Sequence, residues 1–329
     1  MVRVLPGPHP AATLGHVSPR RVAAALAVLL LFLSACSASD YSLTTQAPLA
    51  KGQPHLYWGD LTLDWTQNRL DPIAETATIG GANINGSGMS ESAVIGLDSP
   101  CGVAVDGRHL YWANRNTGTI GRANLDGSGV DYAFIDGAFA PCGVAVDGSH
   151  IYWANHGYAT RGTTIGRANL DGSGANQDFI AGALNPCGVA LDDQYIYWAN
   201  EGASISAGGT IGRANLDGSE ATPSFVITDA LLPCGVAVDA THLYWANGGG
   251  NTIGRATRDV SVVENSFITG GNWPCGVAVD GSHIYWGNSA RASLTSIVPA
   301  IGRANLDGSG VDQTFVTGMA GACGIALDR

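Results

Sequence analysis

The sequence predicts an all-β protein built from six similar repeats, and three observations carry this prediction. The chain of 329 residues holds 46 glycines and only 13% charged residues, against roughly 7% glycine and 25% charged residues in average globular proteins. Hydrophobic residues make up 45% of the chain, which is too many for a disordered protein. The segment PCGVAVD, or a variant of it, recurs six times after residue 99. Abundant glycine and scarce Glu, Lys and Leu argue against a helical bundle and favour a fold rich in strands and turns.

The first 35 residues are expected to be a lipoprotein-type signal peptide. Two arginines precede an apolar run at 22–33, which is too short to cross a bilayer core of about 30 Å as a helix. The run ends in LSAC, which resembles the bacterial lipoprotein box and predicts lipidation of Cys36; an ordinary cleaved signal is the alternative. Residues 36–54 are expected to be a flexible tether from Cys36. The domain at 55–329 would then be exported and anchored to a membrane surface of a bacterial cell envelope.

Each repeat contains four short segments with strand propensity. PCGVAVD at 100–106 is followed by LYWAN at 110–114, by TIGRANLDGS at 119–128 and by a segment around Phe134. Turns rich in glycine, aspartate and asparagine separate them, and Asp126-Gly127 has the residue types of a tight hairpin. Successive repeat cysteines lie 41, 45, 47, 41 and 48 residues apart. Four antiparallel strands at this period are typical of a β-propeller blade.

The two ends of the chain complement one another. The first repeat begins at the Tyr-Trp strand near residue 55 and lacks a Pro-Cys strand, whereas the chain ends on an unpaired Pro-Cys-type strand at 323–329. The C-terminal strand is therefore expected to complete the N-terminal blade. This closes a six-bladed β-propeller and removes the exposed edge that an open array would leave.

These motifs resemble the YWTD-type propeller, which is built from low-density lipoprotein receptor class B repeats. The resemblance covers about residues 55–329 and rests on the Tyr-Trp pairs, the IGRANLDG segment and the PxGVAVD strand. Ala113-Asn114 and its copies replace the Thr-Asp of the family motif, and cysteine follows the proline. The resemblance implies a closed six-bladed propeller of a kind that acts chiefly as an extracellular binding module.

Loop lengths indicate where a ligand would bind. If the Pro-Cys strand runs downward from the top of the channel, the loops after YWAN and before PCG share the top face. Four residues separate Asn114 from Thr119, but the counterparts at 61–77, 156–163, 201–209 and 289–300 are longer. Loops on a rigid scaffold commonly carry binding residues. The candidate ligand-binding residues on the top face are Trp65, His156, Tyr158, Glu201, Trp273 and Arg291.

The six repeat cysteines are expected to form a ring near the channel mouth. They are Cys101, Cys142, Cys187, Cys234, Cys275 and Cys323. Export and an even count favour disulfides. However, a ring radius of about 7–9 Å would separate neighbours by more than the roughly 7 Å that bridged Cα atoms allow. Cys101 also shares strand parity with Val103, which would point it between blades and away from a converging metal site. Buried thiols are the preferred interpretation, with disulfides or a metal or redox role as alternatives.

The sequence predicts no catalytic set, metal or cofactor. Five histidines recur at one register before the Tyr-Trp strand, which indicates a structural hydrogen bond rather than catalysis. Asp106 and Arg122 recur in the same way and invite a structural interpretation, including pairing between blades. The NxDGSG segment at 124–129 lacks the later acid of a calcium loop and is interpreted as a hairpin turn. A net charge of −11 without a basic patch argues against nucleic-acid binding.

We therefore expect a membrane-anchored binding module for a protein, peptide or glycan. Two alternatives stay open: a propeller enzyme of the lactonase, lyase or sugar-dehydrogenase type, and a structural envelope protein without a specific ligand. An active site needs dissimilar groups in unequal roles, whereas near-identical repeats place identical groups around the axis. This argues against the enzyme.

Overall fold

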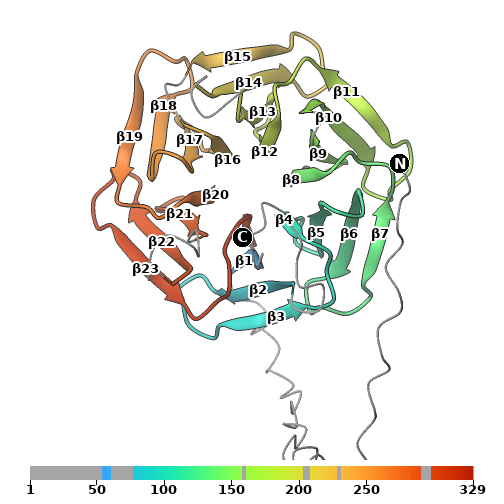
Figure 1. The fold of residues 1–329 in the computed structure, drawn as a ribbon, viewed down its shortest axis with the longest axis horizontal. Coiled ribbons are helices and arrows are strands. Elements are labelled where there is room, and N and C mark those ends of the chain that lie inside the picture. Colours follow the sequence, from blue (N-terminus) through green and yellow to red (C-terminus); the bar gives the residue numbers. More distant parts are fainter. Residues whose placement is uncertain are drawn as a thin grey trace, which may run out of the picture. The chain divides into compact units, whose positions relative to one another are not determined.

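The computed structural model describes residues 54–60, 77–157, 161–202, 208–227, 231–289 and 298–328. These residues form six sheets arranged around a central axis (Figure 1). Each sheet has four antiparallel strands, and the predicted six-bladed β-propeller is confirmed. The described residues contain no helix long and apolar enough to span a membrane.

The strands follow the four predicted segments in every blade. Blade 1 holds β24 (Ile325–Asp328), β1 (His55–Asp60), β2 (Thr78–Asn83) and β3 (Ser90–Val94). Blade 2 holds β4 (Pro100–Val105), β5 (His109–Asn114), β6 (Thr119–Asn124) and β7 (Asp131–Ile135). Blade 3 holds β8 (Pro141–Val146), β9 (His150–Gly157), β10 (Arg161–Asn169) and β11 (Asn176–Ala181). Blade 4 holds β12 (Pro186–Leu191), β13 (Tyr195–Asn200), β14 (Thr210–Asn215) and β15 (Thr222–Ile227). Blade 5 holds β16 (Pro233–Val238), β17 (His242–Asn247), β18 (Thr252–Thr257) and β19 (Val263–Thr269). Blade 6 holds β20 (Pro274–Val279), β21 (His283–Asn288), β22 (Ala300–Asn305) and β23 (Asp312–Thr317).

The chain closes the ring through blade 1. Strand β24 pairs antiparallel with β1, placing Ile325 opposite Trp58 and Leu327 opposite Leu56. Figure 1 shows the C-terminus beside the axis, where the first strand of every other blade also lies. Closure by the C-terminal strand, expected from the complementary chain ends, is confirmed.

The hydrophobic core is divided among the spaces between neighbouring blades. Tyr111 packs toward Trp153 of blade 3, whereas Trp112 packs toward Tyr57 of blade 1. Successive side chains on a strand point to opposite faces, so each Tyr-Trp pair contributes one ring to each of two interfaces. All six tryptophans and six tyrosines of these pairs are buried, with at most 1% of their surface exposed. The low charge of the chain thus reflects sheets that are covered on both faces.

The glycine of TIGRAN makes room for the tryptophan. Gly121 lies opposite Trp112 in the register of β5 and β6, and a Cβ on Gly121 would lie 2.2 Å from the indole ring. The other five blades repeat this clash at 2.1–2.3 Å. The indole therefore lies flat across the neighbouring strand, which only a residue without a side chain permits.

The lower turns are held by aspartate. Asp106 accepts hydrogen bonds from the backbone N–H groups of Arg108 and His109 at 2.9 and 2.7 Å, and from the Tyr111 hydroxyl at 2.9 Å. Although burial opposes it, these donors hold the pKa of Asp106 below its usual value. His109 lies beside this turn, with its Nδ1 3.5 Å from the carboxylate, in agreement with a structural role. Arg122 stacks on the Phe134 ring, 3.8 Å from its centroid.

The predicted hairpin at 124–129 is also present. Asp126 accepts hydrogen bonds from the Ser128 N–H and hydroxyl, while Gly127 and Gly129 have positive φ angles. These contacts account for the aspartate and both glycines without a bound cation.

Several predicted features lie outside the described residues. They are the signal peptide at 1–35, the tether with Cys36, and the candidate residues Trp65, Tyr158 and Arg291.

Candidate functional site

The inner strands surround a narrow channel. Each of β4, β8, β12, β16, β20 and β24 is an edge strand of its sheet, so one row of its peptide groups faces the axis. A cavity of about 330 Å³ runs between them and is lined by their alanine, valine, leucine and isoleucine residues. At the top, the Cys-Gly pairs of all six strands converge and leave a space of about 40 Å³. All six of the repeat cysteines line this space.

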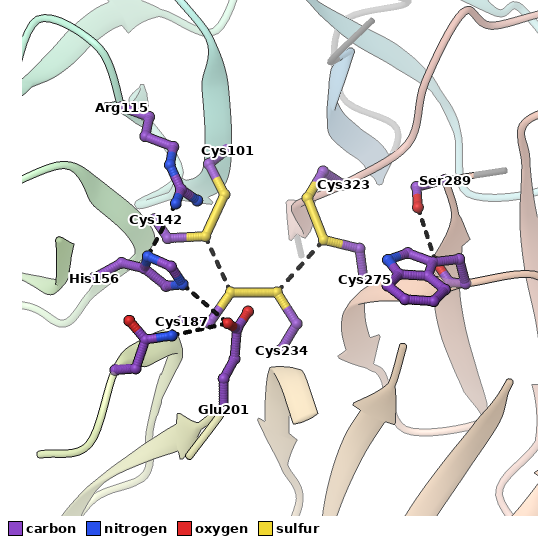
Figure 2. Close-up of a disulfide and its surroundings, with 12 residues drawn as sticks. Cys101, Arg115, Cys142, His156, Cys187, Glu201, Cys234, Cys275, Ser289 and Cys323 are labelled. Atoms are coloured by element: carbon purple, nitrogen blue, oxygen red, sulfur yellow. Dashed lines mark hydrogen bonds and ion pairs between the residues drawn. A yellow bond between two sulfur atoms is a disulfide. The ribbon is translucent and has the colours of Figure 1, made fainter. Parts of the chain in front are cut away.

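The cysteines form three disulfides. Cys101 is bonded to Cys142, Cys187 to Cys234 and Cys275 to Cys323, each with a Cα–Cα distance of 5.0 Å (Figure 2). Each bond joins two neighbouring blades. We call these six residues the sulfur ring. The preferred sequence interpretation, buried free thiols, is therefore wrong.

Two local features explain the error. The glycine after each cysteine lies against the next inner strand: a Cβ on Gly102 would be 2.4 Å from the Cys142 carbonyl oxygen, and the equivalents range from 2.1 to 2.7 Å. Without side chains there, the strands approach more closely than a radius of about 7–9 Å allows. In addition, β4 carries an extra residue between Pro100 and Val103 relative to β5. This bulge breaks the alternation that was used to orient Cys101.

Above the sulfur ring, one position differs in every described blade. It is the residue directly after the Asn of the Tyr-Trp strand, occupied by Arg115, His156, Glu201, Gly248 and Ser289. The backbone N–H of most of these residues donates to the loop before the inner strand of the same blade, as from Arg115 to the Ser99 carbonyl at 3.2 Å. The second-to-third loop is thereby fixed at the channel mouth. We call these five residues the mouth residues.

Three mouth residues from consecutive blades contact one another. Arg115 Nη2 lies 3.0 Å from His156 Nδ1, and His156 Nε2 lies 3.1 Å from a Glu201 carboxylate oxygen (Figure 2). The same oxygen accepts a hydrogen bond from Asn185 Nδ2 at 2.9 Å. Because a carboxylate only accepts, His156 Nε2 donates to Glu201, while Nδ1 lies 3.0 Å from both the Arg115 guanidinium and the Gly157 carbonyl oxygen. His156 and Glu201, predicted separately, thus belong to one network.

Trp273 lies on the same face, in the loop before β20. It has a φ of +51°, and Ser99, Ala140, Asn185 and Leu232 before the equivalent prolines have values of 44–58°. The Trp273 N–H donates to Asn251 Oδ1 at 2.9 Å, and its carbonyl accepts from the Ser289 hydroxyl at 2.9 Å. A left-handed conformation is uncommon for residues other than glycine, so this loop geometry is strongly specified by its hydrogen bonds. The half-buried Trp273 is consequently held in place at the channel mouth.

The Asn of each Tyr-Trp strand ties the top of its blade together. Asn155 Nδ2 donates to the Gln177 carbonyl in the outer strand at 2.8 Å, while its Oδ1 accepts from the Phe139 N–H at 2.9 Å. Equivalent donor bonds occur in blades 2, 4, 5 and 6. The departure from the family motif therefore has a structural reason: an amide both donates and accepts at this position.

Blade 1 has an acid at this position. Asp60 Oδ2 accepts from the Ala320 N–H at 3.2 Å, as the Asn oxygen does elsewhere, but the buried Oδ1 has no hydrogen-bond partner among the residues that the structure describes. Burial, with the charge of Glu91 contributing, raises the pKa of Asp60 to about 6. A protonated Asp60 has the O–H donor that the Asn amide supplies in the other blades.

The mouth holds its charged groups in fixed positions. Both ring nitrogens of His156 contact neighbouring groups, and its surface is 8% exposed. The mouth presents the cation of Arg115, the anion of Glu201 and the indole of Trp273. A second cavity, of about 700 Å³, lies on the lower face between blades 2 and 3, lined by turn residues such as Arg108 and Asp147.

Arg115 was missed from the sequence because its second-to-third loop is one of the short ones. A useful signal was present: the column after YWAN reads Arg, His, Glu, Gly and Ser in otherwise near-identical repeats. Variation at one repeat position can therefore mark a site, just as variation in loop length can.

Comparison with known proteins supports the fold. No protein-family model matches this chain, and no curated protein matches it. Among solved structures, 452 chains are similar. One of them, from the crystal structure of a nidogen/laminin complex, matches with a TM-score of 0.67 and 20% identity, covering 84% of this chain and 98% of that chain. This likeness supports the six-bladed propeller fold.

Proposed function

We propose that this chain is a membrane-tethered, extracytoplasmic interaction module that binds a protein partner with the top face of its propeller. The mouth residues carry this proposal. Turns, cores and inner strands repeat nearly unchanged, whereas Arg115, His156 and Glu201 break the repetition at one ring of positions. A purely structural ring has no evident need for this difference.

The chemistry of the mouth suits a protein surface. Arg115 supports recognition of a carboxylate, and Glu201, with about a fifth of its side chain exposed, supports recognition of a cation. The links through His156 and Asn185 hold the network before a partner arrives, which reduces the entropy lost on binding. Trp273 adds an aromatic side chain of the kind enriched at the centres of protein interfaces. The similar propeller from the nidogen/laminin complex offers a parallel in another protein.

The tether is a separate part of the proposal. It rests on the LSAC motif and on the absence of charge in the apolar run at 22–33. Metabolic labelling with an alkyne fatty acid should label the wild-type chain, whereas Cys36→Ser should lose the label. Equal labelling of both would eliminate Cys36 as the anchor.

Site-specific photocrosslinking in the native envelope tests the binding face. A benzophenone side chain at Ser289 should give a crosslinked protein band, whereas the same group at Gly148 on the lower face should not. Glu201→Gln, introduced with the Ser289 probe, should reduce the band at unchanged protein level. Crosslinking that is equal from the two faces, or absent from both, would reject the proposal.

A further inference from the structure

The sulfur ring is more than three separate crosslinks, because sulfurs of different disulfides are in contact. The Cys142 and Cys187 sulfurs lie 3.0 Å apart, and the Cys234 and Cys275 sulfurs lie 3.5 Å apart (Figure 2). The sulfurs of Cys142, Cys187 and Cys234 all lie within 4.8 Å of one another. Five sulfur-to-sulfur links, three bonded and two non-bonded, therefore run in order from Cys101 to Cys323.

The ring also has an accessible sector and an enclosed one. Cys101, Cys142, Cys187 and Cys323 are 2–6% exposed, whereas Cys234 and Cys275 are only partly buried. The space of about 40 Å³ bounded by all six Cys-Gly pairs lies beside the sulfurs, and the neighbouring glycines carry no side chains that would block their rotation.

We propose that the sulfur ring is a thiol–disulfide exchange site that accepts electrons from a dithiol at Cys234 and passes the reduced state along the ring. Disulfides rearrange when a thiolate attacks a disulfide sulfur, and contact between the two sulfurs is the first requirement. The ring meets this requirement at two of its three junctions between disulfides, Cys142/Cys187 and Cys234/Cys275.

The steps balance with one dithiol as reductant. Its thiolate attacks Cys234, forming a mixed disulfide and releasing the Cys187 thiolate. Cys187 attacks Cys142, forming a Cys142–Cys187 bond and releasing the Cys101 thiolate, which takes up a proton. The second thiol of the reductant resolves the mixed disulfide, leaves as a cyclic disulfide and frees the Cys234 thiolate.

The freed Cys234 continues the sequence on its other side. It attacks Cys275, forming a Cys234–Cys275 bond and releasing the Cys323 thiolate. The dithiol has been oxidised by two electrons, one disulfide of the ring has been reduced, and the two thiols now lie on Cys101 and Cys323. A reductant at the accessible sector thus reduces the residues at the two ends of the series.

The experiment uses the folded chain without denaturant. One equivalent of dithiothreitol is added at pH 8, samples are alkylated with N-ethylmaleimide over time, and tryptic peptides are identified by mass spectrometry. Arginines lie between every two successive ring cysteines, so each cysteine falls in its own peptide. We expect the new linkages Cys142–Cys187 and Cys234–Cys275, with alkylation of Cys101 and Cys323.

Two results would overturn the proposal. One is alkylation confined to the two members of a native pair at every time, and the other is no alkylation until denaturant is added. The double variant Cys101→Ser/Cys142→Ser shortens the series and should shift alkylation to Cys187 and Cys323, with Cys234–Cys275 newly linked. Persistence of Cys275–Cys323 with alkylation of Cys187 and Cys234 in this variant would also contradict exchange.

Discussion

Replacing Asp60 by asparagine should stabilise the propeller at neutral pH. Asp60 is 4% exposed and occupies a position where five other blades use the amide of asparagine to donate a hydrogen bond. Within the described part of the chain, its own Oδ1 has no hydrogen-bond partner. The Asp60→Asn variant supplies the missing donor and removes a buried charge.

The size of the effect follows from the pKa. Burial raises the pKa of Asp60 from 3.8 to about 6 in the folded protein. The protonated form is thus favoured in the native state, and its contribution is complete below pH 3.8 and lost as the pH rises through about 6. At 1.36 kcal/mol per pKa unit, the wild type loses about 3 kcal/mol relative to the variant between pH 4 and pH 8.

Urea unfolding, followed by tryptophan fluorescence under non-reducing conditions, measures this difference. The variant and wild type should have similar free energies of unfolding near pH 4 and diverge by about 3 kcal/mol at pH 8. Asp136→Asn, which removes an exposed acid, is the matched control, and its free energy of unfolding should change with pH as that of the wild type does. If Asp60→Asn gains nothing at pH 8, the argument that the buried Asp60 carboxylate destabilises the fold once it is ionised is refuted.

Three further outcomes concern the fold. Gly121→Ala should lower the free energy of unfolding by about 1–3 kcal/mol, because its Cβ would overlap the Trp112 indole, while Gly148→Ala, which meets nothing within 4 Å, should leave the urea midpoint unchanged. Tyr111→Phe removes a hydrogen bond to the Asp106 carboxylate and should cost about 1.5–3 kcal/mol in the same assay. The pKa of Asp106 is lowered in the folded state, so its stabilising contribution should be lost on acidification below the usual aspartate pKa. Measurements of the free energy of unfolding from pH 6 to pH 2 should show this loss in the wild type. The Asp106→Asn variant should not show it.

Most of the fold could be predicted because each blade repeats the same local physics. A Tyr-Trp pair with both side chains buried requires a neighbour on each face of its sheet, and incomplete repeats at the two ends require closure. The structural interpretation of His109 followed from its recurrence at one register. These inferences needed only the alternation of side chains along the Tyr-Trp strands and the equivalence of the repeats, and the Tyr-Trp strands keep a regular register with the strands that follow them.

The candidate site was harder to predict because it depends on departures from that regularity. The bulge at Cys101 and the close approach at Gly102 are local backbone features that strand parity does not reveal. The contact between His156 and Glu201 joins two blades and 45 residues separate them, so the sequence alone does not show that the two side chains meet. Arg115 shows that a short loop can carry as much chemistry as a long one.

The disulfide pattern determines how the ring is closed covalently. The bonds join blades 2 and 3, blades 4 and 5, and, through β24, blades 6 and 1. Because β24 is tied to blade 6, its pairing with β1 rests on hydrogen bonds and packing alone, and mechanical or chemical opening should begin at that seam. A bond from Cys323 to Cys101 would instead link β24 across the seam to β4 and convert the sheets between them into a covalent circle. Two pairings of the same six cysteines thus correspond to two topologies of one fold. With Cys275–Cys323 the ring of blades is closed without a covalent circle, and with Cys323–Cys101 the backbone between these two residues becomes a covalent circle.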